Sequence, residues 1–128
     1  MPLVRITLAS GTPAETRRAL SDGIHRALVE AANAPADGRF QVIEEVPREN
    51  LVFAPSYLGL AHTGPMLIVQ VTLNAGRTVE TKKALYARLA DCAAALGFRR
   101  EDVLVSLLEV SKENWSFGGG LMSYPPMT

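Results

Sequence analysis

The residue whose position suggests the most distinctive chemistry is Pro2, which follows Met1 and opens the apolar stretch PLVRITL. Removal of Met1, which is usual before a small residue, would leave Pro2 as a free secondary amine. An α-amino group has a reference pKa of about 8, whereas the lysine amines titrate at about 10.4. An apolar pocket or a neighbouring arginine would lower the pKa of the Pro2 amine further, to the range of a general base. With Met1 retained, the same nitrogen is an amide without basicity.

The other residue types that commonly do chemistry are not spaced for a metal, nucleotide or nucleophile motif. His25 and His62 have no partner at metal-ligand spacing, and CxxC, HExxH and EF-hand patterns are absent from the sequence. The single cysteine, Cys92, lies in an apolar helical stripe and can form no internal disulfide. The run 118–120 lacks the Lys and Ser/Thr of a phosphate loop. We therefore expect no metal and no cofactor.

The composition predicts one folded domain, residues 1–128, in which 48% of residues are hydrophobic and 20% charged. Thirteen Lys and Arg balance thirteen Asp and Glu, so the charge pattern favours neither a nucleic-acid nor a membrane partner. No apolar run approaches the roughly 20 residues of a membrane span, and the first residues do not form a signal peptide. We expect a cytoplasmic protein.

The elements that must position Pro2 form an internal repeat with a spacing of 65 residues. Residues 4–20 (VRITLASGTPAETRRAL) align without a gap on residues 69–85 (VQVTLNAGRTVETKKAL). Farther on, the same spacing matches Asp37 with Asp102 and Glu44 with Glu109. Two copies of one supersecondary unit, spanning 2–46 and 67–111, are the simplest account.

Each repeat has the pattern of a β-α-β unit. The predicted strands are 3–8, 39–46, 66–73 and 103–110, with an amphipathic helix between the members of each pair. We expect a capping box at the first helix, with Thr12 as N-cap, Pro13 as first helical residue and Glu15 at the third position. Gly97 is expected to end the second helix.

The helix stripes and the strand pattern together predict an α+β fold. The strands joined by each helix should be parallel, and both apolar helix faces need cover, so both helices should lie on one face of a four-stranded mixed sheet. Strands 66–73 and 103–110 are expected to be apolar on both sides. This pattern predicts that the sheet face away from the helices is buried by oligomerisation. The linker, 47–65, is rich in Pro and Gly. The tail, 111–128, carries Trp115, Phe117 and Tyr124, and we expect it to pack on a neighbouring subunit.

Four stretches together resemble the tautomerase superfamily, in particular its malonate semialdehyde decarboxylase-like branch. They are PLVRITL at 2–8, APADGRFQ at 34–41, NAGRTVETK at 74–82 and NWSFGGG at 114–120. The resemblance covers nearly the whole chain. It implies the tautomerase β-α-β fold, chemistry without metal or cofactor, and a homotrimer. In that family the C-terminal segment of one subunit packs near the amino-terminal proline of the next.

The resemblance also implies catalytic roles for individual residues. Pro2 matches the catalytic amino-terminal proline, and Arg77 matches a carboxylate-binding arginine. The family's second arginine is replaced by Ala75, and its catalytic aspartate aligns with Gly38, so Asp37 lies one position earlier. Two arginines hold a carboxylate more firmly than one. With Ala75 in place of the second arginine, carboxylate binding depends on Arg77 alone or on help from Arg5, Arg39 or His62.

Residues in other stretches are predicted to contact the substrate. Trp115 and Phe117 match the aromatic pair of the family's C-terminal motif, and His62 falls where the decarboxylase has an arginine. Phe40 is predicted to line the same site. His25 matches a family histidine on the first helix, and its position beside the apolar stripe favours a packing role.

Three functions are consistent with these residues. The first is a cofactor-free tautomerase of a small 2-keto or enol carboxylic acid, with Pro2 as neutral base and Arg77 on the carboxylate. The second is a decarboxylase or hydratase of a 3-oxo acid such as malonate semialdehyde, in which Pro2 is protonated or forms an iminium. The third is a trimeric binding protein without chemistry, suggested by Gly38 and Ala75. The pKa of Pro2 separates the first two, since a base titrates below about 7 and a proton donor above it.

Overall fold

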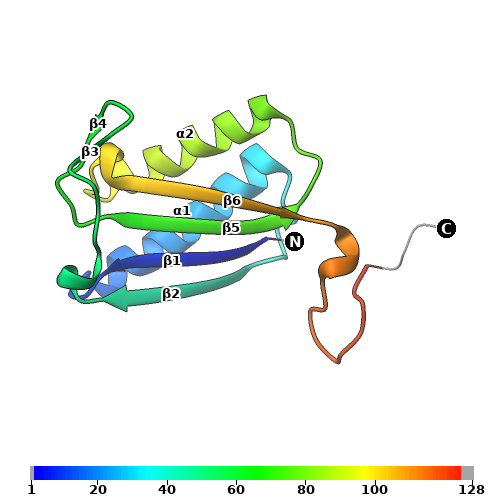
Figure 1. Cartoon of the computed structure of the whole chain (residues 1–128). Coiled ribbons are helices and arrows are strands. Elements are labelled where there is room, and N and C mark those ends of the chain that lie inside the picture. The colour runs from blue at the N-terminus through cyan, green and yellow to red at the C-terminus, as the bar shows by residue number, and fades with distance from the viewer. Residues whose placement is uncertain (1, 125–128) are drawn as a thin grey trace.

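The computed structural model describes residues 2–124, which form two β-α-β units joined into one sheet (Figure 1). The first unit contains β1 (Leu3–Ala9), α1 (Ala14–Ala32) and β2 (Phe40–Val46), and the second contains β5 (Leu67–Asn74), α2 (Val79–Ala95) and β6 (Val103–Val110). Strands within a unit are parallel, whereas β1 and β5 are antiparallel, and the strand order is β2-β1-β5-β6. Both helices cover one face of this mixed sheet, which confirms the predicted α+β fold.

Short elements occupy the connections. The linker holds the 3-10 helix η1 (Arg48–Asn50) and a two-stranded ribbon of β3 (Ser56–Tyr57) and β4 (Leu60–Ala61). The 3-10 helix η2 (Arg100–Asp102) precedes β6, and η3 (Lys112–Asn114) follows it. Because β2 and β5 run in opposite directions, the linker leaves β2 and enters β5 at the same end of the sheet.

The core lies between the sheet and the two helices. Alternate residues of β1 and β5 are at most 2% exposed and pack against the helices, namely Val4, Ile6, Leu8, Leu67, Val69, Val71 and Leu73. The helices approach each other closely at Gly23, where a Cβ atom would lie 2.1 Å from the Sγ of Cys92. Burial raises the pKa of the Cys92 thiol, so this residue stays protonated and serves packing, as the sequence indicated.

The predicted capping box at α1 is wrong. The helix begins after Pro13, which is the N-cap and offers no side-chain hydrogen bond. The Thr12 hydroxyl instead donates to the carbonyl of Ala9 at 2.7 Å, so it is committed to the end of β1. At α2, by contrast, Thr78 is the N-cap, and its hydroxyl accepts a hydrogen bond from the N–H of Thr81.

The strand registers show that the repeat is not gapless. β1 pairs Leu3 with Phe40, whereas β5 pairs Leu67 with Val103, so the second crossover is one residue shorter than the first. Residues that follow the helices therefore correspond at a spacing of 64 rather than 65. The matches predicted from the constant spacing are wrong beyond the helices.

The extra residue lies in the first helix. The two helices start 65 residues apart. The left-handed residues that end them are only 64 residues apart, namely Asn33 (φ 57°) and Gly97 (φ 93°). Gly97 thus ends the second helix as predicted. As a further consequence, the counterpart of Asp102 is Gly38 and not Asp37.

Two ion pairs occupy equivalent positions in the corrected alignment. Arg17 pairs with Glu45 at 3.2 Å in the first unit, and Lys82 pairs with Glu109 at 2.6 Å in the second. Glu45, rather than the predicted Glu44, is therefore the counterpart of Glu109. Each pair joins a helix to the second strand of its own unit.

The face of the sheet away from the helices is open in the single chain. Its exposed apolar side chains are Leu3, Val42, Leu104 and Leu108. The expectation that β5 and β6 are apolar on both sides is wrong, because Gln70 and Ser106 lie on this face. Arg5 and Glu44 form an ion pair there as well. The open face is therefore mixed, with apolar rows separated by polar groups.

Candidate active site

Pro2 lies at one end of the sheet, directly before β1, and is buried. Its neighbour Leu3 pairs with Phe40 of β2 on one side and with Thr72 of β5 on the other. We call this edge, where β1 and β2 start and β5 and β6 end, the Pro2 end. Figure 1 shows the start of β1 there, near the segment that follows β6.

Aromatic rings from the C-terminal segment cross the Pro2 end. The Nε1 of Trp115 donates to the side-chain oxygen of Asn74 at 2.7 Å, and the Trp115 ring stacks on Phe117 with centroids 4.9 Å apart. Phe117 in turn stacks on Phe40 at 5.3 Å. Asn74 belongs to β5 and Phe40 to β2, which flank β1 on either side. The ring row Trp115–Phe117–Phe40 therefore spans the edge at which Pro2 lies and makes that edge apolar.

The described part of the tail thus packs on its own sheet. Tyr124 adds an edge-on contact to Phe117, with centroids 6.0 Å apart. The indole N–H of Trp115 finds its acceptor in the same chain, and the contact of this tail with a neighbouring subunit stays a prediction. Residues 125–128 of the predicted interface segment lie outside the described residues.

Arg77 is held in the loop between β5 and α2 by neutral acceptors. Its Nε donates to the carbonyl of Ala32 at 2.7 Å, and its Nη1 donates to the carbonyl of Asn74 at 2.9 Å. Ala32 is the last residue of α1, so the guanidinium also satisfies a helix-terminal carbonyl. Arg77 makes no ion pair with any residue in the described part of the chain. It therefore combines a defined position with a positive charge that has no ion-pair partner in the described part of the chain.

A carboxylate of the second unit lies close to Arg77. Glu109 accepts hydrogen bonds from Lys82 at 2.6 Å and from the N–H of Gly76 at 3.3 Å. The Lys82 hydrogen bond, with smaller contributions from the Gly76 N–H and the charge of Arg77, holds the pKa of Glu109 below its usual value. Glu109 thus stays ionised and moderates the positive field at the Pro2 end. Sequence reasoning noticed Glu109 only as a repeat position.

Asp37 lies in the turn that leads into β2, also at the Pro2 end. It is exposed, and its side chain makes no hydrogen bond or ion pair within residues 2–124. The neighbouring Gly38 is buried, and its N–H donates to the carbonyl of Pro35 at 3.1 Å. The Nε2 of His25 lies 2.9 Å from the carbonyl of Ala36, so His25 ties α1 to this turn. This contact agrees with the packing role expected for His25.

His62 lies at the opposite end of the sheet from Pro2. Its Nδ1 is 3.6 Å from the carboxylate of Asp102, which directly precedes β6. A strand rises about 3.3 Å per residue, so the seven residues of β1 separate the two ends by about 20 Å. The reason is topological, since the linker both starts and ends at that far edge. Within one subunit, His62 therefore does not join the other candidate residues.

The structure thus brings six of the seven predicted site residues to one end. They are Pro2, Asp37, Phe40, Arg77, Trp115 and Phe117. Asn74 belongs with them, because its side-chain oxygen accepts a hydrogen bond from Trp115 and its backbone carbonyl accepts one from Arg77. Asn74 opens the stretch NAGRTVETK in the sequence, but only the contact with Trp115 shows its positioning role.

Among residues 2–124, no group of three or more His, Cys, Asp or Glu side chains could hold a metal ion. No helix in that range is long and apolar enough to cross a membrane.

The sequence and the fold match a known class of enzymes. A family model described as tautomerase enzyme matches residues 2–61, and a second model with the same description matches residues 38–118. The chain belongs to the tautomerase superfamily. A probable tautomerase of Bacillus subtilis (strain 168), YusQ, is 39% identical over 121 residues, covering 94% of this chain and 95% of that protein.

Solved structures of two other proteins show the same fold. FG41 malonate semialdehyde decarboxylase, inhibited by 3-bromopropiolate, superimposes with a TM-score of 0.89 and 35% identity, over 95% of this chain and 93% of that one. A fused 4-OT protein, solved as a symmetric trimer, superimposes with a TM-score of 0.77 and 30% identity, over 93% and 94% of the two chains.

Proposed function

We propose that this protein is a cofactor-free tautomerase of small 2-keto or enol carboxylic acids, with Pro2 as the general base. The observation that carries the proposal is the convergence of a buried Pro2, an apolar ring row and an unpaired arginine at one end of the sheet. The probable tautomerase YusQ, which shares most of its length with this chain, supports the same reaction class.

The proposed chemistry moves one proton and needs no redox partner. The neutral Pro2 amine, free after removal of Met1, takes a proton from the carbon next to the substrate carbonyl. The electron pair of that C–H bond forms the enolate, and the protonated amine then returns the proton to a different atom. A base positioned in this way typically contributes about 10²–10⁴-fold to the rate. The apolar ring row favours the neutral form of the amine.

Arg77 binds the substrate carboxylate in this proposal. Its Nε and Nη1 donate to backbone carbonyls, and its Nη2 has no acceptor in the described part of the chain. Because Ala75 replaces a second arginine, the remaining substrate contacts come from the ring row and from Asp37. The charge of Arg77 also stabilises the negative charge that develops on the enolate.

A second candidate is decarboxylation of a 3-oxo acid. It is favoured by the likeness to FG41 malonate semialdehyde decarboxylase, at 35% identity over nearly the whole chain. In this reaction Pro2 is protonated and polarises the carbonyl, while Arg77 and Asp37 orient the carboxylate that leaves as CO₂. Asp37 therefore matters more for the second candidate than for the first.

The pKa of Pro2 decides between these candidates. We expect a ¹⁵N NMR titration of the chain, shown by mass spectrometry to lack Met1, to give a pKa below about 7 for the Pro2 amine. The same sample should tautomerise phenylpyruvate faster than it decarboxylates malonate semialdehyde. A pKa above about 7 together with faster decarboxylation supports the second candidate. A folded sample without either activity contradicts both.

We further propose that the protein assembles as a homotrimer through the open face of the sheet. Leu104 and Leu108, which are 46% and 61% exposed, lie on that face and would be buried on association. We expect sedimentation equilibrium at micromolar concentration to give the trimer mass, and L108E to shift the distribution to the monomer. R88E, on the helical face, is the matched control and should leave the trimer intact. A wild-type monomer contradicts the proposal.

A further inference from the structure

The end of the sheet opposite Pro2 is built as a second copy of the Pro2 end. At the corrected spacing, the segment after β2, VPRENLVF at 46–53, aligns with VSKENWSF at 110–117, and the Val, Glu, Asn and Phe positions are identical. Each segment carries a 3-10 helix, η1 or η3, at the same place. The motif that supplies the ring row at the Pro2 end therefore has a counterpart at this far end, where β5 and β6 start.

Other parts of the site are repeated with different residues. Arg77 corresponds to Thr12, which donates to the carbonyl of Ala9 just as Arg77 donates to that of Asn74. The position of Pro2 is taken by Leu67, whose nitrogen is a backbone amide within the chain. The far end therefore repeats the architecture of the site but contains no basic amine at the equivalent of Pro2.

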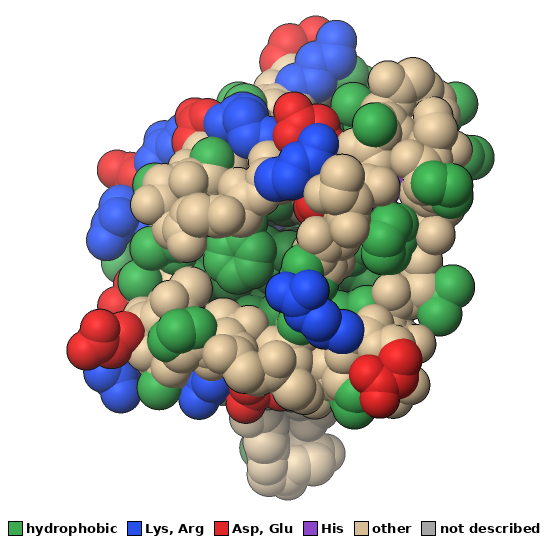
Figure 2. All heavy atoms as spheres, turned by 90° about the vertical axis from the view of Figure 1, so that its left-hand side faces the viewer, with side chains coloured by type: hydrophobic (Ala, Val, Ile, Leu, Met, Phe, Trp, Pro, Cys, Tyr) green, Lys and Arg blue, Asp and Glu red, His purple; other side chains and the backbone are tan. Residues whose placement is uncertain are grey.

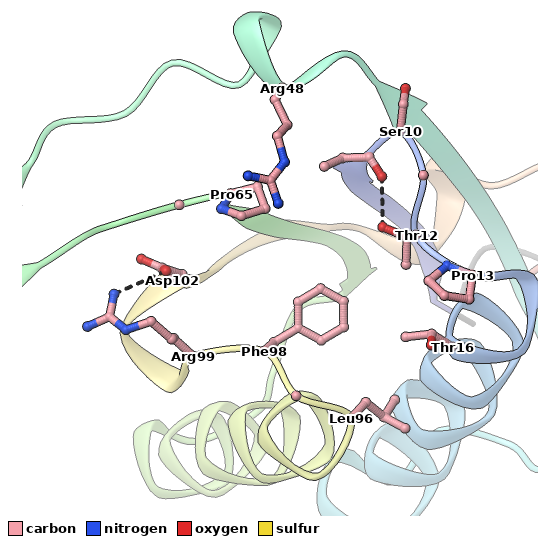
Figure 3. Close-up of a pocket in the computed structure, with 14 residues that line it drawn as sticks. Ser10, Thr12, Pro13, Thr16, Arg48, Pro65, Leu96, Phe98, Arg99 and Asp102 are labelled. Atoms are coloured by element: carbon pink, nitrogen blue, oxygen red, sulfur yellow. Dashed lines mark hydrogen bonds and ion pairs between the residues drawn. The ribbon is translucent and has the colours of Figure 1, made fainter.

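A hollow of about 390 Å³ opens at the far end (Figures 2 and 3). This volume is typical of a site for a small molecule. Figure 3 shows that Phe98 forms its apolar floor and that the side chain of Arg48, from η1, points into it from the opposite wall. Ser10 and Thr16 are also among the residues that line the hollow, and their hydroxyls make no side-chain hydrogen bond within residues 2–124.

The charges around this hollow leave one positive charge uncompensated. Asp102 is 3% exposed and is the acidic residue among those that line it. Burial raises the pKa of Asp102, but hydrogen bonds from the Thr63 N–H, the Arg99 side chain and the Gly64 N–H together lower it further, so the pKa lies below its usual value. The ionised Asp102 is paired with Arg99 at 3.1 Å. The guanidinium of Arg48, in contrast, has no hydrogen bond or ion pair in the described part of the chain.

We propose that the far-end hollow is a second binding site, for a small monocarboxylate with an apolar body, and that it binds without chemistry. Arg48 would hold the carboxylate through its guanidinium, and Phe98 would contact the apolar part. Leu67 supplies no base, so a ligand bound there is not turned over. The inference rests on the far-end residues themselves and does not depend on the reaction proposed for Pro2.

Phenylacetate is a suitable probe, and amide NMR distinguishes the two ends. We expect phenylacetate to shift the amide signals of Gly97 and Phe98 in the wild-type protein. R48Q should weaken that far-end titration at least about 10-fold, because it removes the carboxylate contact. R48K, which keeps the charge, should retain binding within a few fold. Signals at the Pro2 end report its own occupancy separately.

R100Q is the matched control for loss of one positive charge near this hollow. Arg100 lies in η2, and its guanidinium is paired with Asp91 outside the lining residues. We expect R100Q to bind phenylacetate like the wild type, and acetate to bind more weakly than phenylacetate because it lacks a group for Phe98. Unshifted Gly97 and Phe98 amides in the wild type, or equal titrations of R48Q and the wild type, would overturn the proposal.

Discussion

Replacing Pro2 by alanine is expected to lower kcat/KM for phenylpyruvate tautomerisation at least about 100-fold. Alanine keeps a free amine, but a primary one that is less constrained at the start of β1. The loss reflects the contribution of a positioned general base, which is typically about 10²–10⁴-fold. Steady-state kinetics on a variant shown by mass spectrometry to lack Met1 measures the effect. The helices and strands begin after Pro2, so the circular dichroism spectrum should stay that of the wild type.

A chain that retains Met1 provides the sharper form of the same test. Its Pro2 nitrogen is an amide, so both tautomerisation and decarboxylation should be abolished while every side chain is kept. Equal turnover by the Met1-containing and the processed protein would rule out the amine mechanism. If P2A alone has no effect, the base is another residue, and Asp37 is the next to test because it lies at the same end. His62 ranks behind Asp37, because it lies about 20 Å from that end in the same subunit.

Replacing Arg77 by alanine is expected to raise KM about 10- to 100-fold with a smaller change in kcat. The reason is that a carboxylate contact made in both the ground state and the transition state contributes mainly to binding. Arg77 also donates to the carbonyls of Ala32 and Asn74, so R77A should cost about 1–3 kcal/mol in the free energy of unfolding. Urea denaturation and steady-state kinetics measure the two effects separately.

The matched control is R88A, which removes an arginine of α2 that pairs with Glu30 on the surface. It should leave KM unchanged and alter stability by less than about 1 kcal/mol. R77K keeps the charge and should recover part of the binding, with KM between those of the wild type and R77A. If R77A lowers stability but the folded enzyme keeps the wild-type KM, the role of Arg77 is only to donate hydrogen bonds to the end of α1 and to Asn74.

Local patterns in the sequence determined the order of the elements. The alternation in β1 and β5 and the apolar helix stripes are local periodicities, and the 65-residue repeat presents the same local pattern twice, so together they predict two β-α-β units and a mixed sheet. The parallel pairing within each unit then brings Pro2, Phe40 and Arg77 to the same end. The aromatic pair of the tail reaches that end because β6 stops there.

The tertiary structure decided what depends on contacts across the sheet. One additional residue in α1, revealed by the strand register, moved the counterpart of Asp102 from Asp37 to Gly38. The linker begins and ends at the far edge, which places His62 away from Pro2, although no local signal in the sequence distinguishes the two ends. The hydrogen bond between Trp115 and Asn74 joins segments that are distant in the chain. The hollow beside Arg48 is likewise lined by distant segments. The periodicity of neighbouring residues determines which segments form helices and strands, whereas contacts between distant segments depend on how whole elements pack.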